Sequence, residues 1–184
     1  MLDQLSALVK QYGDDAIVNN NAVPNQYNQE VLDEASSSIF TGLQQVLSQG
    51  GTQQLAEIFQ GDNAASSNNA VVQQLSQQLS GNLGAKFGLD SATASGLAGS
   101  LVPKVLGALI GKAKNPNDSS LQISDIVNAI GGSNNSGLMD AISQYGAQFG
   151  LDQNNDGKVD MGDAMAAVNK KGGLGGLLGK FFGK

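Results

Sequence analysis

The stretch LGAKFGLDSATASGLAGSLVPKVLGAL, residues 83–109, decides the fold class of this chain. Its apolar residues recur at helical spacing on both sides of a Gly-Leu-Asp turn at 88–90. Asp90 or Ser91 is a natural N-cap for the following helix, because a short side-chain oxygen can accept hydrogen bonds from the first free backbone N–H groups. The stretch therefore predicts helices that are separated by a tight turn.

A proline interrupts the second half of this stretch. Pro103 has no backbone N–H and restricts the residue before it, so it is expected to end or kink the helix near Leu101. A further helix is then predicted to carry Val105, Leu106, Leu109 and Ile110.

These motifs resemble the core of the YidB-like bacterial proteins of unknown function. The resemblance is carried by the Gly-Leu-Asp turn, the TAS helix start at 93–95 and the LVPKVL break at 101–106, and it covers about residues 28–131. That family is all-helical and has no established activity. The resemblance therefore implies a helical fold and adds no catalytic residues.

Helical periodicity continues on both sides of this stretch. Leu2, Leu5, Leu8 and Val9 form one apolar stripe, and the other predicted helices span about 26–49, a short segment from Thr52, 70–87, 121–130 and 138–149. Gly50-Gly51 and Gly131-Gly132 are typical of helix C-termini. No strand pairs are evident. We expect an all-α, multihelical bundle of seven to nine short helices.

Composition narrows the function classes. The 184 residues contain no Cys, His or Trp, and all ten basic residues are Lys. Disulfides, thiolate metal sites and imidazole-dependent catalysis are therefore excluded. The net charge of −6 and the absence of Arg disfavour nucleic acid as a partner.

The stretch 83–101 also imitates a helix-turn-helix. Its would-be recognition helix, 91–101, has no basic side chain, Asn or Gln, so DNA binding is disfavoured.

The N-terminal segment is amphipathic and carries Asp3, so no signal peptide is expected. No window approaches a membrane span of about 20 apolar residues. The default expectation is a cytoplasmic protein, with export by a route that needs no N-terminal signal left open.

The segment DQNNDGKVDMGD, residues 152–163, has the pattern of a twelve-position calcium loop. Gly157 occupies position 6, where the sharp turn needs glycine, and Val159 occupies position 8, the apolar anchor. The predicted ligands at positions 1, 3, 5, 7, 9 and 12 are Asp152, Asn154, Asp156, the Lys158 backbone carbonyl, Asp160 and Asp163. All are oxygen donors, which suit the hard cation Ca²⁺.

The loop resembles that of EF-hand proteins, with Asp163 in place of the usual Glu at position 12. Asp at this position also occurs in dockerin-type modules, but those use two such loops and this chain has one. The shorter side chain makes bidentate coordination harder. A solvated Asn/Asp-rich loop is the structural alternative.

The C-terminal segment KKGGLGGLLGKFFGK, residues 170–184, combines an apolar stripe with positive charge. The stripe comprises Leu174, Leu177, Leu178, Phe181 and Phe182. Six of the fifteen residues are Gly, each costing about 1 kcal/mol in a helix relative to Ala. The segment is therefore expected to be helical only where its face is buried, on the protein itself, on a partner or on an anionic membrane.

The remaining concentrated acids suggest one enzymatic alternative. Glu30, Asp33 and Glu34 share a helix face, with Glu57 elsewhere, and paired carboxylates can act on glycosides. A solvated helix face is the preferred interpretation.

The sequence thus divides into four parts: an N-terminal helical segment (1–62), a YidB-like core (63–150), a calcium loop with its exiting helix (151–169) and a basic tail (170–184). The expected function is that of a calcium-binding, non-enzymatic helical protein. It would act by self-association or through a protein or surface partner. Membrane-surface binding by the tail and a carboxylate-dependent hydrolase are the alternatives.

Overall fold

The computed structural model describes residues 2–20, 22–60, 65–115, 120–132 and 137–142, in which every regular element is helical. The predicted all-α, multihelical fold is therefore confirmed. The elements are α1 (Leu2–Gly13), the π-helix η1 (Asp14–Val18), the 3₁₀ helix η2 (Asn25–Tyr27), α2 (Asn28–Ser48), α3 (Thr52–Gln60), α4 (Ala70–Phe87), α5 (Ser91–Ala113) and α6 (Ile123–Gly131).

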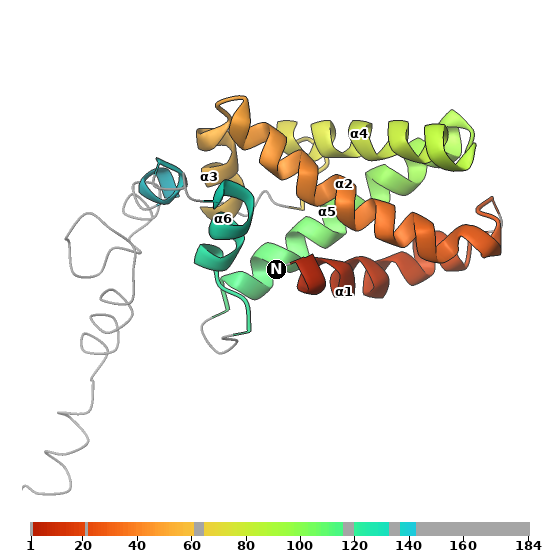
Figure 1. Ribbon diagram of the computed structural model, residues 1–184, viewed down its shortest axis with the longest axis horizontal. Coiled ribbons are helices and arrows are strands. Elements are labelled where there is room, and N and C mark those ends of the chain that lie inside the picture. The colour runs from red at the N-terminus through yellow and green to blue at the C-terminus, as the bar shows by residue number, and fades with distance from the viewer. Residues whose placement is uncertain (1, 21, 61–64, 116–119, 133–136, 143–184) are drawn as a thin grey trace, which may run out of the picture.

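The four longest helices form the body of the bundle, and the short helices α3 and α6 lie at one end of it (Figure 1). α5 packs against α4 and α1, while α2 packs against α4 and α1 and also contacts α6. α3 and α6 lie near each other at the end where α2 finishes (Figure 1). The chain leaves the described residues at this same end.

One cluster of buried apolar side chains joins these helices. It includes Leu5 and Val9 from α1, Ile39 from α2 and Leu79 from α4, all fully buried. The predicted stripes therefore face a common core that draws on helices from both sides of position 62. Leu2, predicted in the first stripe, is instead 46% exposed.

The prediction that Pro103 ends its helix near Leu101 and that a further helix follows is wrong. α5 runs without interruption through Pro103, which is itself buried. Leu101, Val102 and Val105 are buried on either side of it, so core packing outweighs the missing N–H bond. The carbonyl left without that donor belongs to the exposed Gly99, where water can reach it.

Local signals fix the ends of α4 and α5. Asn69 caps α4, its Oδ1 accepting from the N–H groups of Val71 at 2.9 Å and Val72 at 3.3 Å. Gly88 ends α4 at φ +66°, in the left-handed region that favours glycine. Asp90 caps α5, as the sequence predicted.

Asp90 makes α5 sensitive to acid. The Thr93 hydroxyl donates to its carboxylate at 2.6 Å and is the main cause of a pKa below the ordinary 3.8; the Thr93 and Ala92 N–H groups add to the effect. A carboxylate with a lowered folded-state pKa contributes stability above its unfolded pKa and loses it as pH falls through the folded pKa.

We predict that Asp90→Asn reduces the loss of folding stability that occurs as the pH is lowered into the acid range. Asn also caps helices, so little should change near neutral pH, whereas the wild type should lose more stability than the variant as the pH falls below about 4. Thermal unfolding across this pH range measures the difference. If the stability of the two proteins fell equally with decreasing pH, the stabilising role of the Asp90 carboxylate would be contradicted.

Among the described residues, α5 alone has the length and composition to cross a membrane, with 23 residues and a mean hydropathy of 1.4. This corrects the expectation that no window approaches such a span. The hydropathy is that of an 18-residue window within α5. Half of this window is buried inside the bundle, where α5 packs against α1 and α4.

Candidate functional site

All predicted calcium ligands lie outside the described residues. They are Asp152, Asn154, Asp156, Lys158, Asp160 and Asp163. The EF-hand type of the loop, its exiting helix and the tail at 170–184 fall in the same part of the chain, so they stay predictions. What the structure describes is the segment that leads to the loop.

Residues 137–142 are helical and sit on the core, which confirms the beginning of the helix predicted at 138–149. Leu138 and Ile142, one helical turn apart, are 1% and 4% exposed and belong to the central cluster. Ile142 precedes the first predicted ligand, Asp152, by ten residues. The candidate calcium loop therefore follows closely on a segment that is fixed to the bundle.

No other metal site competes with the loop within the described part of the chain, where no three acidic side chains come together. The acidic residues that were predicted to share a face of α2 do not converge on one point. Glu30 and Asp33 are exposed, as a solvated helix face requires, and Asp33 accepts a hydrogen bond from Gln29 at 2.9 Å. Glu57 is exposed on a different helix, α3.

Glu34 contradicts the expectation of a solvated face. Its side chain is only 10% exposed, and it lies between α2 and α4. Its Oε1 accepts from Ser38 Oγ and from Asn82 Nδ2, both at 2.9 Å, and its Oε2 pairs with Lys86 Nζ. Asn82 Nδ2 also donates to Ser38 Oγ at 2.9 Å.

This network satisfies a carboxylate that would be costly to bury alone. Lys86 is 58% exposed, so its ion pair is screened by water, and the hydrogen bonds from Asn82 and Ser38 carry the specificity. The network fixes the register of α2 on α4. Sequence reasoning missed it, although Glu34–Ser38 and Asn82–Lys86 show the same i, i+4 spacing.

A shallow groove of about 520 Å³ lies between residues 16–22 and the first half of α5. Two of its polar groups hold the backbone in place: Asn20 bonds to the Ala16 carbonyl at 3.2 Å and the Ala22 N–H at 3.0 Å, and Thr93 bonds to Asp90. No carboxylate lines this groove.

A second groove, of about 230 Å³, lies between α4 and α5. Its lining includes Gln73, Ser76 and Pro103 and no charged side chain. Neither groove brings together the acid and base that hydrolysis of a glycoside needs.

No protein-family model, curated protein or solved structure matches this chain. The resemblances to YidB-like proteins and to EF-hands therefore stay predictions. Any functional assignment must come from the residues themselves.

Proposed function

We propose that this is a calcium-binding, non-enzymatic helical protein that acts by association with a second copy, another protein or a surface. The observation that carries the proposal is the loop 152–163, which agrees with the calcium-loop pattern at its glycine and anchor positions and at its ligand positions except the last, where Asp163 replaces the usual Glu. Four carboxylates in twelve residues repel one another, and a divalent cation removes that repulsion.

The anchored segment before the loop supports a structural consequence of binding. Leu138 and Ile142 tie the chain to the core ten residues before Asp152. In our proposal, ordering of the loop around calcium extends the ordered structure outward from this anchor. Binding to the folded chain alone then stabilises that fold by mass action.

Calorimetric titration with calcium tests the site. We expect one ion per chain in the wild type and at least a tenfold loss of affinity in Asp156→Ala, because position 5 supplies a direct carboxylate ligand. Asp140→Asn is the matched control, since Asp140 is an exposed carboxylate outside the loop. Absence of binding heat in the wild type, with a melting temperature that chelators do not change, would refute the site.

The affinity also bears on the role. A micromolar constant favours intracellular signalling, and a near-millimolar constant favours a structural ion outside the cell. Light scattering as a function of protein concentration, with and without calcium, addresses self-association. A strict monomer in both conditions would argue against assembly.

The hydrolase alternative receives no support from the described residues. Neither of the two grooves described above is lined by one of its carboxylates, and Glu34 is engaged in hydrogen bonds between two helices. The YidB-like resemblance adds a helical core to the proposal and no activity. Membrane binding by the basic tail competes with docking of the same segment on the helical bundle.

A further inference from the structure

One face of α2 carries a stripe that no other described helix fully covers. Its five positions are Asp33, Ser37, Phe40, Gln44 and Leu47, spaced alternately four and three residues apart. Asp33 and Ser37 are exposed, and the other three are partly buried. We call these five residues the α2 stripe.

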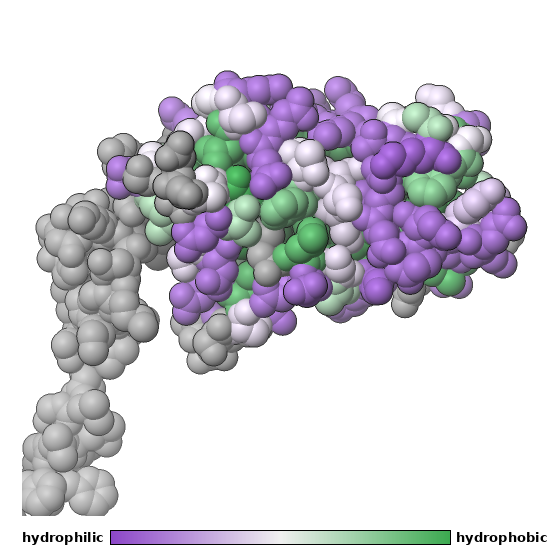
Figure 2. Space-filling model, in the orientation of Figure 1, coloured by the Kyte–Doolittle hydropathy of each residue, from purple (hydrophilic) through white to green (hydrophobic). Residues whose placement is uncertain are grey.

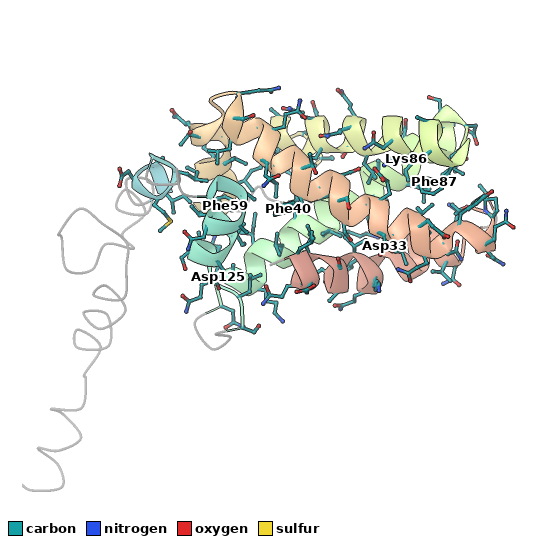
Figure 3. All side chains as sticks on the ribbon, viewed as in Figure 1. Asp33, Phe40, Phe59, Lys86, Phe87 and Asp125 are labelled. Atoms are coloured by element: carbon teal, nitrogen blue, oxygen red, sulfur yellow. The ribbon has the colours of Figure 1, made fainter. Side chains whose placement is uncertain are left out.

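The stripe has an apolar part and an acidic end. Phe40 lies between α2 and α6, where a band of hydrophobic side chains reaches the surface (Figures 2 and 3). Phe40 and Leu47 pack against the core without being buried by it. Asp33 lies seven residues before Phe40 on the same helix (Figure 3).

The tail at 170–184 matches this stripe in length and chemistry. At about 1.5 Å per residue, the apolar positions Leu174–Phe182 extend about 12 Å as a helix, and Phe40–Leu47 extend about 10 Å. Lysines stand at both ends of the tail, at 170, 171, 180 and 184, so either orientation brings one near Asp33. With six glycines, the tail gains helical structure only by packing on such a face.

Charge and chain length favour an intramolecular contact. Residues 1–142 contain twelve acidic side chains and five lysines, a net charge of −7, whereas the tail carries four lysines and no acid. Twenty-seven residues lie between Ile142 and Lys170, and the chain leaves the described residues at the end of the bundle where α2 finishes, so this tether does not have to be extended for the tail to reach the stripe (Figure 1). Tethering also gives the tail an effective concentration on the order of millimolar.

We propose that residues 170–184 dock as a helix on the α2 stripe of the same chain. The leucines at 177 and 178 cover Phe40, and a tail lysine lies beside Asp33. This contact does not require the calcium site. It makes the tail an intramolecular cover for the apolar surface through which the protein would otherwise associate.

A tryptophan reporter tests the contact, since the wild type contains no Trp. In Phe40→Trp, removal of residues 170–184 should shift the emission to longer wavelength and increase quenching by acrylamide. Tyr27→Trp is the control, because Tyr27 is 38% exposed, packs on Phe87 and lies outside the stripe. Its emission should not respond to the truncation. Unchanged Phe40→Trp emission would overturn the proposal.

A full-length variant separates loss of docking from an effect of truncation. Leu178→Asp combined with Phe182→Asp should reproduce the Phe40→Trp shift, because both changes place charge on the tail's apolar face. A protein that keeps the wild-type emission would count against docking. A calorimetric failure to bind calcium leaves this result unaffected, so the two proposals fail separately.

Disulfide capture identifies the occupant, since the chain has no cysteine of its own. Ser37→Cys with Leu174→Cys or, for the opposite orientation of the tail, with Phe181→Cys should form a disulfide within the monomer at low protein concentration, because both tail positions lie on the apolar face. Gln73→Cys, exposed on α4, replaces Ser37→Cys in the control. Disulfide-linked dimers alone would overturn the proposal in favour of a second copy. Protection of Phe40→Trp only on phosphatidylserine vesicles would overturn it in favour of a membrane.

Discussion

Replacing Phe59 with alanine is expected to lower the free energy of unfolding by about 3–5 kcal/mol, the usual cost of truncating a buried aromatic side chain. Phe59 is fully buried and is the largest of the fully buried side chains in the described part of the chain (Figure 3). The loss combines the transfer free energy of the ring with the cavity that remains.

The position of Phe59 makes the effect severe for one element in particular. α3 has only nine residues and is held to the bundle by its buried residues Leu55, Ala56, Ile58 and Phe59. A helix this short is not stable by itself in water. Loss of the ring therefore leaves a cavity in the core and also weakens the attachment of α3 to the bundle.

Chemical denaturation of wild type and Phe59→Ala, analysed with a common m-value, measures this loss. A change of 3–5 kcal/mol is a large fraction of the 5–15 kcal/mol that usually separates folded and unfolded states. Phe59→Leu is the matched control and should cost less than about 1.5 kcal/mol, because it keeps most of the volume. Equal destabilisation by the two variants would contradict the cavity argument.

Replacing Gly42 with leucine is expected to cost about 1–3 kcal/mol, because the site on α2 has no room for a side chain. A Cβ at Gly42 would lie 2.1 Å from Leu75 Cδ2 and 2.8 Å from Gln78 Oε1, both on α4. The side chains of Leu75 and Gln78 already occupy this space. A larger residue at position 42 must displace them and so loosen the core contacts around the fully buried Leu75.

Gly81→Leu supplies the matched control on the other helix of the pair. A Cβ at Gly81, which is exposed on α4, would meet nothing within 4 Å. The same substitution there should leave stability unchanged or raise it by up to about 1 kcal/mol, because leucine is the better helix former. Thermal or denaturant unfolding of both variants decides the point. A Gly42→Leu protein as stable as Gly81→Leu would refute the close packing.

Helix positions were predictable because their signals are local. The α4 prediction at 70–87 agrees with Ala70–Phe87, and the predicted cap Asp90 accepts hydrogen bonds from the N–H groups of Ala92 and Thr93, both at 3.0 Å. A cap and the helix it begins lie within four residues of each other, so sequence spacing fixes both. The candidate calcium loop is predicted from the same kind of local pattern, and it lies outside the described residues.

Two of the wrong predictions, those on Pro103 and Glu34, share a different origin. Pro103 was expected to break α5, and Glu34 was expected to face solvent. The decisive neighbours of Glu34 are distant in sequence, since Asn82 and Lys86 lie 48 and 52 residues from it. The buried Pro103 lies in a helix that packs against α4 and α1. The pattern within one helix identifies a proline or a row of acidic residues, but it contains no information about the side chains that pack against them.

The sequence by itself determined that the described part of the chain is all-helical and where its main helices lie, and it predicts which oxygens would form a calcium site. Tertiary structure alone decided that α5 continues through Pro103, that Glu34 joins α2 to α4, and that Gly42 is a point of close approach. Helical periodicity acts over three or four residues and can be read from one segment. The side chain that meets Gly42 or Glu34 depends on how two helices are placed against each other, and that is set by the packing of the whole core.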